Sequence, residues 1–256
     1  MDFLTTVLHH FTSGAAAYLT TYQMGYSQTR PNLLAGFQLA ESGSVPFFTA
    51  LSTRAAEEGD FWLSQKLARH AADENRHGQI FAHGLKQLGK QVIDRQSLAQ
   101  QEQEHKKDPD KKSNSFYATY FAGYTPTDLK AENIDWLVFM GSTHILELDA
   151  SRDFLLMTNA LKDSDRADCN LKTGILSIAK DETRHAAYLL EAMERRFGSS
   201  ITQKTVDEWR TRKVNALMAM LNNAVAKSGA IPNLAEDIQD RSESLAEKPL
   251  ASLVNA

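Results

Sequence analysis

The pattern Asp-Glu-x-Arg-His occurs twice in this chain, and each copy lies within a long stretch of helical periodicity. The two copies span residues 73–77 and 181–185. Around each of them, apolar residues recur at intervals of three and four, which is typical of one face of an α-helix. The Glu and the His of each copy are three residues apart, so both project from that apolar face. A chain folded around these faces must bury two carboxylates and two imidazoles.

Burial of four such groups needs a compensating partner. A single Glu-x-x-His pair is more often an exposed pair on a helix surface than a pair of metal ligands. Two copies inside apolar stripes are different, because a buried charge without a partner costs several kcal/mol. The carboxylate and the imidazole of each copy can instead converge on one ion. We therefore interpret the two motifs as parts of one metal site.

Helical periodicity continues through nearly the whole sequence, and no stretch alternates cleanly at period two. The fold class is therefore predicted to be all-α. We expect a single helical domain over residues 1–228, with a core bundle at 31–197 and a C-terminal tail at 229–256. Helices are predicted at about 2–26, 31–58, 61–88, 132–161, 165–198 and 202–228.

The four central helices form two predicted hairpins, each closed by a short polar turn. A long connection between the hairpins follows Gly89 and contains a short helical stretch near 95–105 and a polar loop at 106–112. The helix after this connection is expected to begin after Pro126 or by Glu132. Two hairpins joined by one long crossover are typical of a ferritin-like four-helix bundle. The first and last helices would be additions to that bundle.

The other two central helices each carry one glutamate in an otherwise apolar stripe, Glu41 and Glu147. At a rise of 1.5 Å per residue, Glu41 and Glu74 both lie about 22–27 Å from the tip of their hairpin. Glu147 and Glu182 lie about 24–28 Å from the tip of theirs. Within each predicted hairpin, the two carboxylates therefore lie level with each other.

The charge of these groups predicts two divalent cations. Four carboxylates and two neutral imidazoles sum to −4, which two divalent ions would cancel. The chain has one cysteine, so sulfur-ligated zinc and iron modules are excluded. Mixed carboxylate and imidazole ligands suit iron or manganese. The predicted metal ligands are Glu41, Glu74, His77, Glu147, Glu182 and His185.

Two more histidines lie beside these ligands in the sequence. His70 lies one helical turn before Glu74, and His144 lies three residues before Glu147. Each is a candidate for an extra ligand or a polar residue of the site, and the alternative for each is a core histidine bonded to a neighbouring carboxylate or carbonyl. No catalytic residue is predicted beyond the metal ligands.

The paired motifs resemble those of the oxygen-activating ferritin-like di-iron carboxylate proteins. Similar families include soluble acyl-carrier-protein desaturases, multicomponent monooxygenase hydroxylases and di-iron N-oxygenases. The resemblance implies that Asp73 orients His185 and that Asp181 orients His77, with support from Arg76 and Arg184. A carboxylate bonded to a ligating imidazole fixes its tautomer and raises its basicity.

The resemblance further implies an oxygen-dependent non-haem di-iron oxidoreductase, of the oxidase or monooxygenase type, acting on an enclosed small organic or acyl substrate. Its cofactors would be two iron ions, or manganese with iron. Dioxygen would be the co-substrate, and an external reductant, such as an electron donor protein, would be needed. Iron storage with ferroxidase activity, aldehyde deformylation and a heterodinuclear oxidase remain alternatives. The radical subunits of ribonucleotide reductase resemble this pattern too, but they place a radical tyrosine at the position that Phe81 occupies here. This difference argues against that family.

Composition limits the other partners. A net charge of −4 provides no general attraction to nucleic acid or to an anionic membrane. No apolar run approaches the roughly 18 residues needed to cross a bilayer, and the start of the chain lacks the basic head of a signal peptide. A cytoplasmic location is therefore expected. A homodimer is possible, but no heptad pattern in the sequence identifies a contact surface for it.

Overall fold

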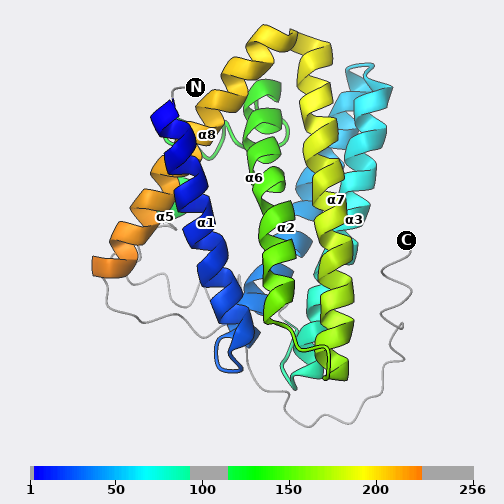
Figure 1. Ribbon diagram of the computed structural model, residues 1–256. Coiled ribbons are helices and arrows are strands. Elements are labelled where there is room, and N and C mark those ends of the chain that lie inside the picture. Colours follow the sequence, from blue (N-terminus) through cyan, green and yellow to red (C-terminus); the bar gives the residue numbers. More distant parts are fainter. Residues whose placement is uncertain (1–2, 93–114, 227–256) are drawn as a thin grey trace, which may run out of the picture.

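The computed structural model describes residues 3–92 and 115–226, and these residues form helices joined by turns and loops (Figure 1). No β-strand occurs among them, so the all-α prediction is confirmed. The predicted helix near 95–105, the polar loop at 106–112 and the tail at 229–256 lie outside the described residues. The elements are α1 (Phe3–Gly25), α2 (Arg30–Glu57), α3 (Phe61–Gln87), α5 (Ser115–Tyr120), α6 (Trp136–Met157), the short 3₁₀ helix η1 (Thr158–Ala160), α7 (Arg166–Phe197) and α8 (Ser199–Ala226).

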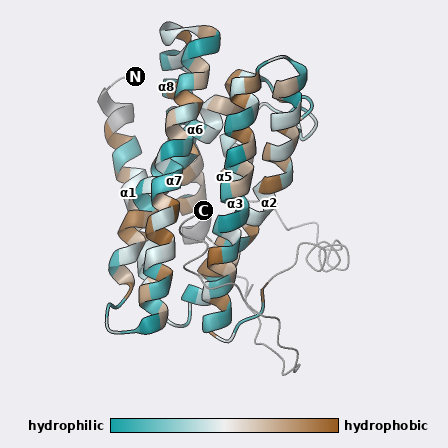
Figure 2. Ribbon diagram, turned by 90° about the vertical axis from the view of Figure 1, so that its right-hand side faces the viewer, coloured by the Kyte–Doolittle hydropathy of each residue, from teal (hydrophilic) through white to brown (hydrophobic). Residues whose placement is uncertain are grey.

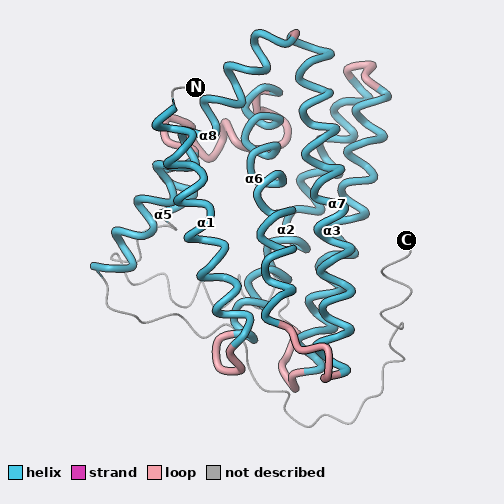
Figure 3. Tube along the Cα trace, in the orientation of Figure 1, coloured by secondary structure: helices cyan, strands magenta, loops and turns pink. Residues whose placement is uncertain are grey.

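Two long helix pairs make up the centre of the molecule. Helix α2 packs along α3, helix α6 packs along α7, and α3 contacts α7. Figure 1 shows α3 and α7 side by side and running in opposite directions. Helices α1 and α8 contact each other and α6, and α5 packs against α8. The described loops join helices at their ends, as Figure 3 shows.

Aspartates define where three of these helices begin. Asp60 accepts a hydrogen bond from the backbone N–H of Leu63 at the start of α3, and Asp165 caps α7 in a similar way. Asp135 caps α6, which therefore begins at Trp136 and not by Glu132 as the sequence predicted. Just before this cap, the Arg54 guanidinium donates to the carbonyl oxygens of residues 131 and 134, at 3.1 and 2.7 Å. These bonds hold the segment in a non-helical course.

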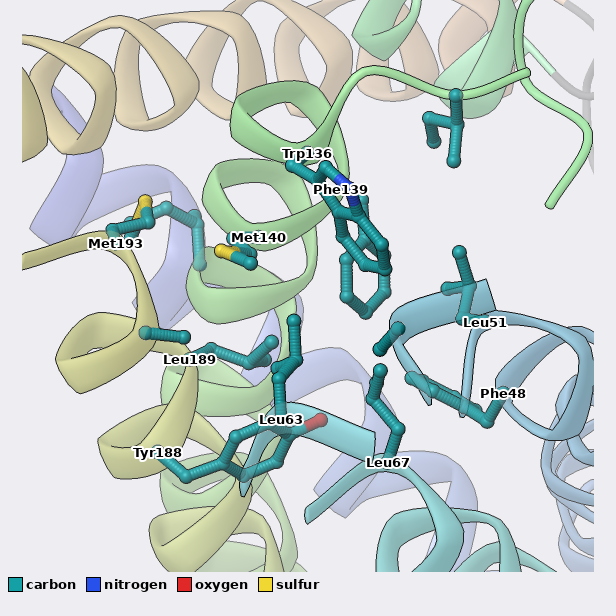
Figure 4. Close-up of a cluster of buried hydrophobic side chains, with 14 of the residues drawn as sticks. Phe48, Leu51, Leu63, Leu67, Trp136, Phe139, Met140, Tyr188, Leu189 and Met193 are labelled. Atoms are coloured by element: carbon teal, nitrogen blue, oxygen red, sulfur yellow. The ribbon is translucent and has the colours of Figure 1, made fainter. Parts of the chain in front are cut away.

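Two apolar clusters fill the interior. The first contains Leu51, Leu67, Phe139 and Leu189, one from each of the four central helices (Figure 4). The second cluster also takes residues from each of these four helices, among them Leu34, Phe81, Phe154 and Ile178. On every one of the four helices, the glutamate predicted as a ligand lies in the sequence between its members of the two clusters. The polar residues are thus enclosed by apolar packing at both ends.

Figure 2 shows hydrophilic and hydrophobic residues interspersed along each helix. Among the described residues, no helix combines the length and the apolar content that a membrane span requires.

Candidate metal centre

The six predicted ligands converge from four helices onto one buried region. Helix α2 contributes Glu41, α6 contributes Glu147, and α3 and α7 each contribute a Glu-x-x-His pair. Both motif histidines are at most 1% exposed, and Glu182 is 2% exposed. Glu147 is partly exposed, with 13% of its side chain accessible. Such burial is unusual for carboxylates that lack a positive partner.

The first group of potential ligand atoms comes from Glu41, Glu74, His77 and Glu182, and these atoms all lie within 4.8 Å of one another. The His77 Nδ1 atom lies 3.2 Å from Glu182 Oε1 and 3.4 Å from Glu41 Oε2. Glu74 Oε1 is 3.7 Å from the same nitrogen. One imidazole nitrogen and three carboxylates therefore lie close enough together to hold one metal ion.

The second group consists of His70, Glu74, Glu147 and His185, within the same 4.8 Å limit. His70 Nε2 lies 3.2 Å from Glu74 Oε1 and 3.4 Å from Glu147 Oε1. His185 Nδ1 lies 3.8 Å from Glu74 Oε1. Glu74 belongs to both groups, and Glu182 Oε2 also lies 3.3 Å from His185 Nδ1. Two adjoining clusters of nitrogen and oxygen donors thus share a boundary.

Aspartates hold the outer edges of the two motif imidazoles. His185 Nε2 donates to Asp73 Oδ2 at 3.2 Å, and His77 Nε2 donates to Asp181 Oδ2 at 3.4 Å. Each aspartate contacts the histidine of the other motif, because α3 and α7 pack side by side in opposite directions. With Nε2 used in this way, the Nδ1 atom of each ring faces the glutamates.

Arginines bind these aspartates in turn. Arg184 donates to Asp73 Oδ2 at 2.5 Å and to Asp181 Oδ1 at 2.7 Å, so it joins the two motifs. Arg76 contacts Asp181 on the neighbouring helix. Burial by itself would raise the pKa of Asp73, but the hydrogen bond from His185 and the charge of Arg184 lower that pKa to about 2. Asp73 is therefore ionised, and both outer aspartates are paired with arginines.

Two of the inner carboxylates, Glu147 and Glu41, have a different electrostatic environment. Burial, together with the neighbouring charge of Glu182, raises the pKa of Glu147 to about 8. Burial and the charges of Glu74 and Glu182 raise the pKa of Glu41 well above its ordinary value. Burial would raise the pKa of Glu74 as well, but the close contact with His70 and the charges of His70 and His77 lower it. The cluster lacks enough positive charge to keep all of its carboxylates ionised near neutral pH. A bound cation would supply that charge.

Two buried nitrogen atoms indicate that the donor set fits a metal ion. His77 Nδ1 and His70 Nε2 make no hydrogen bond with any described residue, although carboxylate oxygens lie within 3.4 Å of both. Buried polar atoms are nearly always hydrogen-bonded. Imidazole nitrogens together with carboxylate oxygens are ligands suited to first-row divalent metals. The described His and Glu clusters are therefore compatible with binding metal.

Two contacts of the centre were not among the sequence-based predictions. Ser44 Oγ donates to Glu74 Oε2 at 2.8 Å, and Tyr188 Oη lies 2.8 Å from His70 Nδ1. Each of these residues lies three positions after a predicted ligand, so helical spacing would have placed it on the same face. The predicted candidate His144 lies in neither of the two groups found among the described residues, and its Nδ1 lies 2.8 Å from the carbonyl oxygen of Ala186.

Comparisons with protein-family models, with curated proteins and with solved structures gave no match. Inference about function therefore rests on the geometry and chemistry of the cluster itself.

Proposed function

We propose that this protein is an oxygen-dependent non-haem di-iron oxidoreductase, of the oxidase or monooxygenase type, with a ferritin-like four-helix bundle as its scaffold. The observation that carries the proposal is the pair of adjoining ligand groups that share Glu74. A single ion would not use both groups. The arrangement of α2 with α3, and of α6 with α7, on either side of a long connecting segment supports the ferritin-like scaffold.

In this proposal one iron would be held by Glu41, His77 and Glu182, and the other by Glu147 and His185, with Glu74 belonging to both ligand groups. Two ferrous ions held by these residues would supply the electrons with which dioxygen is activated to oxidise an organic substrate. An external reductant, such as an electron donor protein, would restore the ferrous state. Manganese in one of the two positions is the heterodinuclear alternative.

The chain itself would orient the ligands and enclose the reaction. Asp73 and Asp181 hold the outer nitrogens of the two imidazoles, which leaves Nδ1 of each ring for the metal. The apolar clusters at both ends of the site limit the access of water. A small organic or acyl substrate would react within this apolar surrounding.

Metal content is the first test. Protein loaded anaerobically with Fe(II) should contain about two irons per chain, as a dinuclear site requires, and should consume dioxygen when a reductant is present. His185→Ala should remove metal and oxygen consumption, because it removes a ligand from the enclosed centre. Glu57→Ala is the matched control, since Glu57 is an exposed glutamate on α2. Full metal content and activity in His185→Ala would sink the assignment.

Iron storage is the alternative that the same preparation can test. Storage requires a large assembled shell that takes up far more iron than its ligand groups can bind. Size-exclusion chromatography and iron uptake in excess Fe(II) separate the two functions. A small particle that stops at about two irons per chain supports the oxidoreductase, whereas a shell that continues to take up iron supports storage.

A further inference from the structure

His70 is the residue of the cluster that the paired motifs do not account for. It lies on α3 one turn before Glu74, and its side chain is fully buried. Its Nε2 atom faces oxygens of Glu74 and Glu147 at 3.2 and 3.4 Å without forming a hydrogen bond to any described residue. A buried nitrogen directed at two carboxylates has the position of a ligand.

The His70 ring is held in place on three sides. It stacks on Phe48 with 3.7 Å between the ring centroids and on His185 with 3.6 Å. At its other nitrogen, Nδ1, the hydroxyl of Tyr188 lies 2.8 Å away. The ring cannot rotate without giving up this hydrogen bond, so Nε2 stays directed at the centre.

The contact with Tyr188 can fix which nitrogen of His70 carries the proton, because a phenol oxygen can accept a hydrogen bond from Nδ1. A neutral imidazole has one N–H group and one free lone pair. If Nδ1 donates its proton to the phenol oxygen of Tyr188, then Nε2 keeps the lone pair that a metal needs. The partner of His70 is thus a phenol hydroxyl, whereas the partner of His185 is the carboxylate of Asp73.

His70 also makes the two ligand groups unequal. With it, the group around Glu147 contains two imidazoles and two carboxylates, whereas the group around Glu41 contains one imidazole and three carboxylates. The position on α7 that matches His70, four residues before the motif glutamate, is the fully buried Ile178. The nitrogen-rich position should favour iron or cobalt, and the oxygen-rich position is better suited to manganese.

We propose that His70 is a seventh metal ligand, positioned by Tyr188, and that it gives the Glu147 side of the centre a greater selectivity for Fe(II) or Co(II) over Mn(II) than the Glu41 side has. The inference rests on the proposed dinuclear site, because it assigns different ligand sets to the two metals. Only the chain's own donor atoms enter the argument, so the test can be made without turnover.

The experiment is anaerobic titration of the metal-free full chain with Co(II), followed by visible absorption and by the amount of metal bound. Wild-type protein should bind two ions, with distinct spectra. In His70→Gln, the affinity for one Co(II) should fall by about tenfold to a hundredfold or more, while the other stays near its wild-type value. Tyr188→Phe retains the ring and removes the acceptor, so a smaller loss, about tenfold, is expected at the same ion.

His144→Gln is the matched control, because His144 is buried on α6 and bonded to a backbone carbonyl outside both groups. It should leave both affinities unchanged, and circular dichroism should confirm that every variant is folded. If His70→Gln and Tyr188→Phe both keep the wild-type affinities and spectra, His70 is not a ligand, although the six-ligand proposal stands. If wild-type protein binds no Co(II), Fe(II) or Mn(II), the proposed function fails together with this inference. Should His70→Gln not fold, Tyr188→Phe decides the matter.

Discussion

Helix α6 carries two carboxylates two residues apart, Glu147 and Asp149, and they have opposite surroundings. Residues at this spacing point to different sides of a helix. Asp149 is 2% exposed and faces α1 and α8, where Lys213 Nζ donates to it at 2.6 Å and Ser13 Oγ donates at 3.1 Å. Glu147 faces the other carboxylates of the candidate metal centre.

The pKa values of the two groups diverge for this reason. Burial would raise the pKa of Asp149, but hydrogen bonds from His9 and Lys213 and the charge of Lys213 lower it well below its ordinary value. Burial and Glu182 raise the pKa of Glu147 to about 8. A buried carboxylate beside a cation of the chain stays ionised at a helix interface. A buried carboxylate without one is suited to bind a cation from outside.

Removal of the cation at the Asp149 side should have the largest effect on stability. Lys213→Met leaves Asp149 buried without its closest ion-pair partner and should lower the free energy of unfolding by about 3–5 kcal/mol. Urea denaturation measures this loss. The double variant Lys213→Met/Asp149→Asn should recover much of it while metal content stays at the wild-type level. A loss of metal in the single variant, in protein shown to be folded, would break the distinction between the two sides.

Addition of metal should stabilise the protein through the Glu147 side. A ligand that binds only the folded state at about 100 times its dissociation constant adds about 2.7 kcal/mol per site. Thermal unfolding with and without Mn(II) or Co(II) should show this as a rise in Tm. The same addition to His185→Ala should give a clearly smaller rise. An equal rise in both proteins would place the metal elsewhere.

The pH dependence of the metal-free protein should show the same contrast. A carboxyl group whose pKa rises from 4.5 to about 8 on folding stabilises the folded state while it is protonated, and this contribution is lost as the pH rises toward that value. Between pH 6.5 and about 8, Glu147 should thus cost the metal-free protein about 1–2 kcal/mol. Urea titrations across this window should show the loss, and saturating metal should remove it. Asp149, with its lowered pKa, should contribute nothing in this window and lose its contribution only in acid.

The smallest effect is expected from Glu147→Gln in the metal-free protein. The change removes a carboxylate that is already hard to ionise, so the free energy of unfolding should change by less than about 1 kcal/mol. Metal titration of the same variant should show the loss of one of the two ions. The comparison with Asp149→Asn is direct, because that variant should lose stability and keep its metal. The reverse result, with Glu147→Gln destabilised and fully loaded, would exchange the two roles.

Much of the centre could be predicted because it depends on spacing along single helices. The Glu and His of each motif lie on one face whatever the helix packs against, and Glu41 and Glu147 stand out as single charges in apolar stripes. The start of α6 was less predictable, since it depends on contacts of Arg54 with the segment before Asp135. Such contacts leave no periodic pattern in the sequence.

The sequence by itself determined that the chain is helical and which polar residues would face its interior, because the helical repeat is a local property. Only the tertiary structure decided which of these residues meet across helices. The partners His70 and Tyr188 are 118 positions apart, and Asp149 and Lys213 are 64 apart. Their contacts depend on how whole helices pack, to which every core residue contributes. For this reason the paired motifs indicated a metal site, while the packing distinguished the carboxylates that have a cation of their own from those that do not.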